Sequence, residues 1–395
     1  MSADSPFFSS EELEYLARED IRAFLCAFVS REDLVRHGFL LFGAGAHSRI
    51  ILPLLLGAGL PPAWIVDGNP ALVGTCVEGI PVRGKESLSE SGDRHVLLGS
   101  RYVPDMLEDC RKYGAVHPLP LTAVCSFVFL PASMGLCPDS VLNNPQVEEA
   151  YALMSDDFSR TIYRNVIRFQ CLFCEDLFAA YDKNIYFPAD LAPKIDYSRF
   201  VDAGAFTGDT LLEWLRYCRH ARMANDTLAY WGFEPGSEQF AQLRQTVQGI
   251  PSPCGIAIYP VALGAVSRDR TIAGKGAATT VTGGNDQASG THIVREKRLD
   301  DIEGVNPTFL KADVEGFELP LLEGALSVIS RCRPALGISV YHRVDDLWKI
   351  PLWIKRHCPD YSLYLRHHTP AWGDTVLYAI PPEGSSGRLH HDTLG

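Results

Sequence analysis

The stretch that decides the fold is FVDAGAFTGDT at residues 200–210, followed directly by LLEWL at residues 211–215. A short apolar run breaks into glycines and then into residues that favour a helix, a pattern that predicts a strand, a tight turn and a helix. Gly204 and Gly208 carry no Cβ, so a ligand can approach the backbone closely there. The helix exposes unpaired N–H groups at its start, and the stretch therefore predicts a nucleotide-type cradle.

A carboxylate at the end of the next predicted strand supports this interpretation. Glu234 stands near the end of LAYWGFEP at residues 228–235. A carboxylate in this position can accept hydrogen bonds from both hydroxyls of a ribose. The glycines and the spaced acid together predict a nucleotide-type ligand site in the C-terminal half of the chain.

Five segments in that half follow one another in an order that is specific to one family. They are DAGAFTGDT at 202–210, FEP at 233–235, KADVEGFE at 311–318, YH at 341–342 and TVLYA at 375–379. This order resembles the FkbM family of S-adenosylmethionine-dependent methyltransferases. The resemblance covers roughly residues 150–381, and DVEGFE is its most distinctive part.

The resemblance implies an α/β fold with a seven-stranded, Rossmann-like (class I) methyltransferase sheet and S-adenosylmethionine as the cofactor. It further implies methyl transfer to a hydroxyl of a sugar, a glycoside or a related metabolite, so the partner would be a small-molecule or glycan acceptor. The turn would hold the methionine part of the cofactor, Glu234 the ribose, and two apolar residues after the third strand the adenine. The implied cofactor-binding residues are Asp202, Gly204, Ala205, Phe206, Thr207, Gly208, Thr210, Glu234, Pro235, Ala262, Leu263 and Asp313.

Strands and helices alternate from residue 199 onward, which predicts a parallel sheet covered by helices. The predicted strands are 200–202, 228–234, 256–261, 308–312, 335–341, 362–365 and 375–379. Only a turn separates the last strand from its predecessor, so we expect it to be antiparallel. Residues 274–290 are rich in small side chains and predict either a lid over the site or a flexible insertion.

Candidate catalytic residues gather at the carboxyl ends of these strands, where an open parallel sheet binds its ligand. They are Asp313, His342, Glu315 and His367. A hydroxyl acceptor must be aligned and must lose its proton; alignment can contribute roughly 7–11 kcal/mol and a general base about 10²- to 10⁴-fold. Asp313 and His342 are the candidate bases, because a histidine near its ordinary pKa is available as a base and a carboxylate can orient it.

Two other interpretations of these residues stay open. Asp313, Glu315, His342 and His367 could hold a divalent metal ion that lowers the pKa of the acceptor hydroxyl. Alternatively, His367 only bonds its own backbone, while Glu315 and Glu318 cap the predicted helix 319–329. For Glu318 we favour capping.

A second, smaller Rossmann-like α/β domain is predicted before residue 131. FLLF at 39–42 runs into GAGAHS at 43–48, and AWIVD at 63–67 ends in Asp67. This domain resembles the nucleotide-sugar-binding domains of sugar acyltransferases; Gly43, Gly45 and Ser48 would hold a phosphate and Asp67 a ribose. The alternative is a degenerate domain that serves packing or dimer formation.

Composition limits the class of protein. The chain has 395 residues and a net charge of −12, too acidic for a nonspecific binder of nucleic acid or anionic membranes. The start shows no signal sequence, and the longest apolar run is too short to span a bilayer. Eleven cysteines form no repeated framework, so we expect a cytoplasmic protein with free thiols, which could be a homo-oligomer.

We expect five parts: an N-terminal helical segment (1–37), the Rossmann-like domain (38–130), a linker and helical cap (131–185), the methyltransferase domain (186–382) and a flexible tail (383–395). Five prolines between residues 118 and 145 mark the boundary, with a short strand at Val124–Leu130. The competing functional hypothesis is a nucleotide-sugar or dinucleotide-binding module whose methyltransferase-like half is not catalytic.

Overall fold

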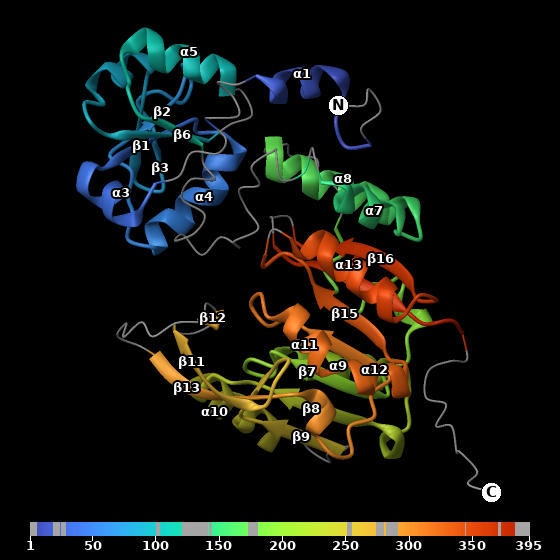
Figure 1. Cartoon of the computed structure of the whole chain (residues 1–395). Coiled ribbons are helices and arrows are strands. Elements are labelled where there is room, and N and C mark those ends of the chain that lie inside the picture. Colours follow the sequence, from blue (N-terminus) through green and yellow to red (C-terminus); the bar gives the residue numbers. More distant parts are fainter. Residues whose placement is uncertain are drawn as a thin grey trace, which may run out of the picture. The chain divides into compact units, whose positions relative to one another are not determined.

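The computed structural model describes residues 6–18, 24, 29–99, 103–120, 141, 144–172, 181–250, 255–273, 280–281, 291–343, 345–369 and 373–383. The chain divides into two compact units (Figure 1). Unit 1 comprises Met1–Glu148, Tyr163–Ala179 and Pro370–Trp372, and unit 2 comprises Glu149–Ile162, Ala180–Thr369 and Gly373–Gly395. Two predicted segments, the strand Val124–Leu130 and the tail after Glu383, lie outside the described residues.

Unit 1 is built on a six-stranded sheet in the order β3-β4-β2-β1-β5-β6. The strands are β1 Phe39–Phe42, β2 Ile65–Val66, β3 Cys76–Val77, β4 Ile80–Arg83, β5 His95–Leu98 and β6 Pro118–Pro120. All neighbours are parallel except β3 and β4. The helices are α1 Ser10–Ala17, α3 Arg31–His37, α4 Ala46–Gly57 and α5 Val103–Tyr113. Strand β1 is buried along its whole length, as its continuous apolar run FLLF requires in a parallel sheet.

Unit 2 is built on a seven-stranded sheet in the order β16-β17-β15-β14-β7-β8-β9. The strands are β7 Arg199–Ala203, β8 Ala229–Phe233, β9 Gly255–Tyr259, β14 Phe309–Ala312, β15 Ala335–Ser339, β16 Ser362–His367 and β17 Thr375–Ile380. Strand β17 runs antiparallel to both β15 and β16 and lies between them. The predicted fold class, including the antiparallel last strand, is confirmed.

The helices of unit 2 follow the strands in the expected alternation. They are α9 Asp209–His220, α10 Ser237–Gln248, α11 Glu318–Gly324, α12 Leu326–Cys332 and α13 Asp346–His357. Two further helices, α7 Pro145–Ala152 and α8 Asp157–Leu172, precede this sheet in the chain, and both are divided between the two units, α7 after Glu148 and α8 after Ile162. No helix in the described ranges is long and apolar enough to cross a membrane.

An aromatic core fixes the first strand and first helix of this sheet. Phe200, Trp214 and Tyr230 are fully buried, and the rings of Phe200 and Tyr230 stack at a centroid distance of 5.8 Å. The indole N–H of Trp214 donates to the carbonyl of Tyr197 at 2.7 Å. Because each such ring buries roughly 150–250 Å², these contacts hold β7 and α9 firmly and thereby position the turn between them.

A small second sheet of unit 2 was not predicted. It has the order β10-β13-β11-β12, with β10 Ala262–Leu263, β11 Arg268–Ala273, β12 Thr280–Val281 and β13 Thr291–Lys297. Strands β11 and β13 pair antiparallel across the small-residue stretch. Apart from Thr280 and Val281, that stretch lies outside the described residues, so its role as lid or insertion stays a prediction.

Candidate functional site

The turn between β7 and α9 is shaped by the backbone of a neighbouring strand. Ala203 pairs with Ala312 of β14, which brings Asp313 beside Gly204. Gly204 has φ +80°, and a Cβ added there would lie 1.9 Å from the carbonyl oxygen of Asp313. Position 204 therefore requires glycine for its own packing and not only for the approach of a ligand.

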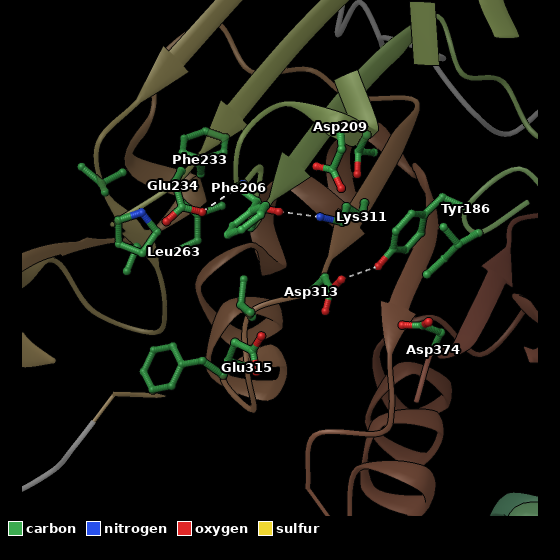
Figure 2. A pocket seen from close by; sticks show the side chains of 18 of the residues that line it. Tyr186, Phe206, Asp209, Phe233, Glu234, Leu263, Lys311, Asp313, Glu315 and Asp374 are labelled. Atoms are coloured by element: carbon green, nitrogen blue, oxygen red, sulfur yellow. Dashed lines mark hydrogen bonds between the residues drawn. The ribbon is translucent and has the colours of Figure 1, made fainter. Parts of the chain in front are cut away.

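A pocket of about 400 Å³ opens at the carboxyl ends of these strands (Figure 2). Its volume lies within the usual range of about 300–1,000 Å³ for small-molecule sites. It is lined by Ile185, Tyr186, Gly204, Phe206, Asp209, Thr210, Glu213, Phe233, Glu234, Pro235, Val261, Ala262, Leu263, Lys311, Asp313, Val314, Glu315, Phe317, Tyr341 and Asp374.

The structure brings most of the predicted cofactor residues to this pocket. Those that line it are Gly204, Phe206, Thr210, Glu234, Pro235, Ala262, Leu263 and Asp313. Ala205 is fully buried, the carbonyl of Thr207 accepts from the hydroxyl of Thr246, and Gly208 occupies the N-cap position of α9. These last three shape the turn without lining the pocket.

Glu234 closes the turn and still has acceptor capacity. Its Oε2 accepts from the backbone N–H of Phe206 at 3.0 Å, and its Oε1 accepts from that of Gly236 at 2.7 Å. Burial raises the pKa of Glu234, while these two N–H groups oppose the shift. Each carboxylate oxygen can accept a second hydrogen bond, so the group can receive two hydroxyls from the pocket.

Asp202 does not line the pocket, contrary to the expectation that it contacts the cofactor. Its carboxylate is fully buried, accepts from Lys311 Nζ at 2.8 Å and also bonds the hydroxyl of Tyr230. Lys311 Nζ donates in addition to the carbonyl of Gly204 at 2.6 Å. Strand β14 places Lys311 directly opposite Asp202 of β7. The two side chains thus form a buried ion pair that supports the turn through the bond from Lys311 to Gly204.

Two tyrosine hydroxyls hold Asp313 at the pocket wall. Tyr186 donates to Oδ2 at 2.9 Å and Tyr341 donates to Oδ1 at 3.3 Å. Burial alone would raise the pKa of Asp313, but Lys311, His342 and the hydroxyl donors outweigh it and lower that pKa. Neither tyrosine was among the predicted site residues, although Tyr341 stands in the YH segment at 341–342 and Tyr186 in a Tyr-Phe-Pro segment at 186–188.

His342 is surrounded by carboxylates and is not a neutral base, which corrects the prediction. Its Nδ1 lies 2.8 Å from Glu318 Oε1, and its Nε2 lies 3.4 Å from Asp313 Oδ1 and 3.6 Å from Glu315 Oε2. Burial would lower the pKa of His342, but the three carboxylates raise it to about 10. At neutral pH the ring is therefore protonated, and it is not among the residues that line the pocket.

His367 lies apart from this group, so its predicted place in the site is also wrong. Its side chain is buried, and its Nδ1 lies 3.0 Å from the hydroxyl of Thr375. The physical reason is the strand order: β17 and β15 stand between β16, which carries His367, and β14, which leads to Asp313.

Glu315 faces the pocket from a strained backbone position. It has φ +55°, and its side chain is 44% exposed. Partial burial together with Asp313, Glu318 and Glu234 raises its pKa to about 7, while His342 opposes the shift. Four of the seven described non-glycine residues with positive φ line this pocket, namely Tyr186, Phe206, Glu315 and Asp374. Strained backbone conformations gather at functional sites, so this distribution is independent support for the site.

Three side chains of unit 2 place donor atoms close enough together to hold a metal ion. Asp313, Glu318 and His342 each offer one atom, and these atoms lie within 4.8 Å of one another. Glu318 is fully buried and its Oε2 has no hydrogen-bond partner, while Oε1 accepts from the N–H of Val314 at 2.9 Å. The geometry thus replaces the predicted ligands Glu315 and His367 by Glu318, which also holds the loop before α11.

The glycine-rich turn of unit 1 is occupied by its own side chains. Asp67 Oδ2 accepts from the N–H of Ala44 at 2.7 Å. The hydroxyl of Ser48 is buried and donates to the carbonyl of Gly99 at 3.4 Å, a geometry that does not suit a phosphate ligand. A ligand role for Gly43, Gly45 and Asp67 stays a prediction.

Comparisons with known proteins agree with this fold. Residues 202–366 match the family described as Methyltransferase FkbM domain. The crystal structure of methyltransferase FkbM from Methylobacillus flagellatus KT is 22% identical, covers 95% of this chain and 100% of its own, and superimposes with a TM-score of 0.60. No curated protein matches the chain significantly.

Two rRNA methylase structures are more distant. A putative one from Clostridium thermocellum is 10% identical, covers 47% of this chain and 87% of its own, and has a TM-score of 0.30. One from Streptococcus thermophilus is 12% identical, covers 48% of this chain and 90% of its own, and has a TM-score of 0.29.

From the family match we conclude that unit 2 contains an FkbM methyltransferase domain at residues 202–366.

Proposed function

We propose that this protein uses S-adenosylmethionine to methylate a hydroxyl group of a sugar, a glycoside or a related metabolite. The observation that carries the proposal is a single pocket that combines the Gly204 turn, Glu234 and the acids Asp313 and Glu315. The match to the FkbM methyltransferase domain supports the class of reaction. The choice of a hydroxyl acceptor rests on the resemblance seen in the sequence.

The charge of the pocket suits this cofactor. Six carboxylates line it, those of Asp209, Glu213, Glu234, Asp313, Glu315 and Asp374. The one lining amine, that of Lys311, is already paired with Asp202. S-adenosylmethionine carries a positive sulfonium and a positive ammonium group, which an excess of carboxylates attracts. We assign the ribose hydroxyls to Glu234 and the adenine to the apolar wall at Ala262 and Leu263.

The bound cofactor would supply an electrophilic methyl group, and the chain must orient the acceptor hydroxyl and remove its proton. We assign the proton to Glu315, because it faces the pocket and its pKa of about 7 suits a base near neutral pH. Asp313, fixed by Tyr186 and Tyr341, would orient the hydroxyl. Protonated His342 balances the charge of the surrounding carboxylates.

A metal-assisted version of the same reaction uses the group of Asp313, Glu318 and His342. A divalent ion there would displace the proton of His342 and lower the pKa of an acceptor hydroxyl. The two versions differ under chelation. Pre-treatment with EDTA should leave the rate unchanged if Glu315 acts alone, and should abolish a metal-assisted rate until a divalent ion is restored.

The cofactor part of the proposal is tested by calorimetric titration of the full chain with S-adenosylmethionine. Glu234→Ala should weaken binding by about 10-fold or more, since hydrogen bonds to a charged group contribute about 1.5–3 kcal/mol. The matched control is Glu238→Ala, an exposed acid on α10, which should bind like the wild type. No binding to the wild type, or equal binding to both variants, would refute this assignment.

The acceptor is tested separately, with methyl-labelled cofactor and pooled hydroxyl-bearing sugars and glycosides. A labelled product that survives mild alkali is an ether, as O-methylation of a hydroxyl requires, whereas a methyl ester is hydrolysed. Label found only in esters or in methylated amines would overturn the hydroxyl assignment and leave the cofactor assignment intact.

A further inference from the structure

Three histidines meet at one edge of the unit 1 sheet. Strands β1, β5 and β6 are neighbours and parallel, so their amino ends share an edge. His37 ends α3 just before β1, His95 is the first residue of β5, and His117 directly precedes β6. The glycine-rich turn follows the carboxyl end of β1, so the histidines lie at the opposite edge from it.

The three rings are close to the spacing of a metal site. The ring centroids of His37 and His95 are 6.0 Å apart, and those of His95 and His117 are 5.6 Å apart. In a tetrahedral site with Zn–N bonds of about 2.0–2.1 Å, imidazole centroids lie about 5 Å apart. His37 and His117 are exposed and can rotate. Such rotation is needed, because the three histidines do not already place donor atoms that all lie within 4.8 Å of one another.

His95 is the unusual member of the group. Both of its ring nitrogens are buried and neither has a hydrogen-bond partner. A neutral imidazole always has one N–H donor and one acceptor nitrogen, and a buried pair of this kind without partners calls for an explanation.

We propose that His37, His95 and His117 form a binding site for a divalent transition-metal ion of the zinc type. Imidazole nitrogens favour zinc, nickel and copper ions over magnesium and calcium, which prefer oxygen ligands. Asp33 stands four residues before His37 on α3, hence on the same face of the helix, and can add a carboxylate or orient a ligand. A bound ion would tie α3 to β5 and β6 and so stabilise unit 1.

The test titrates untagged, EDTA-treated full-length protein with Zn²⁺ by calorimetry. His390 and His391 adjoin in the sequence and can bind zinc themselves, so all measurements use a background in which both are alanine. His37→Ala and His117→Ala should each lower the affinity for one equivalent of Zn²⁺ by about 10-fold or more. His220→Ala, an exposed histidine at the end of α9, is the matched control and should change nothing. His342→Ala, in the other donor group, should leave this equivalent in place.

A second readout is the melting temperature. Zn²⁺ should raise it in the His390→Ala/His391→Ala parent and not when His37→Ala and His117→Ala are added to that background, which keeps His95 and should therefore fold. Equal zinc affinity in the double variant and its parent would overturn the proposal, as would an equal response to Mg²⁺. The result does not depend on methyltransferase activity, so the proposed function stands or falls separately.

Discussion

The two glycine-rich turns of this protein are alike in plan. Each links a central strand to a helix, β1 to α4 in unit 1 and β7 to α9 in unit 2. In each, an acid after the adjacent strand accepts a backbone N–H of the turn: Asp67 from Ala44 at 2.7 Å, and Glu234 from Phe206 at 3.0 Å. The turn and its acid alone therefore do not distinguish a catalytic unit from a packing domain.

The difference lies in the strand on the other side. In unit 2 this strand is β14, which ends at Ala312 and leads to Asp313 and Glu315 at the pocket. In unit 1 it is β5, which ends at Leu98 and leads to Gly99. A Cβ on Gly99 would lie 2.2 Å from Ser48 Oγ, so the space is filled by the protein itself. The neighbouring strand, and not the turn, therefore leads to the acids of the proposed catalytic group.

The largest expected effect tests that neighbouring strand. Glu315→Gln removes the proposed base and should lower turnover by about 10²- to 10⁴-fold while cofactor affinity is retained. Asp67→Asn in unit 1 should leave turnover unchanged. Because protonation inactivates a base, the wild-type rate should rise with pH up to about 7, the pKa of Glu315, and then level off. Steady-state kinetics across pH measure the turnover of the variants and the pH dependence of the wild type. Full turnover by Glu315→Gln would refute the assignment of Glu315 as the base.

The next effect compares two lysine–aspartate pairs. Lys311 and Asp202 are 2% and 0% exposed, whereas Lys85 and Asp109 are 40% and 16% exposed. Lys311→Met leaves the buried carboxylate of Asp202 without its partner and should reduce the free energy of unfolding by about 3–5 kcal/mol. Lys85→Met should cost less than about 1 kcal/mol. Urea unfolding of both variants measures the contrast, and similar losses would show that burial does not govern these pairs.

The two turns themselves can be compared through their glycines. Gly204→Ala would place a Cβ 1.9 Å from the carbonyl of Asp313 at a positive φ, whereas Gly45→Ala would meet no atom within 4 Å. The left-handed conformation alone costs about 1–2 kcal/mol, and the clash adds to it. We expect a lower melting temperature and loss of cofactor binding for Gly204→Ala, and a change within about 0.5 kcal/mol for Gly45→Ala. Equal effects would contradict the close approach of β14.

The smallest expected effect is none at all. All residues that line the pocket lie within residues 185–374, so a chain without residues 1–140 should bind S-adenosylmethionine as tightly as the full chain. Circular dichroism would first establish that the shortened chain is folded. A folded chain that no longer binds would show that unit 1 contributes to the cofactor site and would overturn our division at about residue 185.

The sequence alone determined the strand pattern of unit 2 and several of the residues that line its pocket. Strand ends can be recognised because apolar runs stop at glycines and acids, and parallel strands expose their carboxyl ends at one edge. This is why Gly204, Glu234 and Asp313 could be assigned to one place before the structure was known. The sequence did not predict strands β11 and β13, because their pairing joins residues on either side of a stretch without periodicity.

Only the tertiary structure decided the charge states and the membership of the site. The pKa of His342 depends on Glu318, Asp313 and Glu315 together, a sum that no sequence spacing reveals. Strand β17 lies between β16 and β15, so His367 on β16 is far from Asp313. The pairing of β7 with β14 places Asp202 opposite Lys311, with which it forms a buried ion pair. The local sequence pattern specifies where strands end. The pKa values of side chains depend on distances between residues that are far apart in the chain, and these distances are defined only after folding.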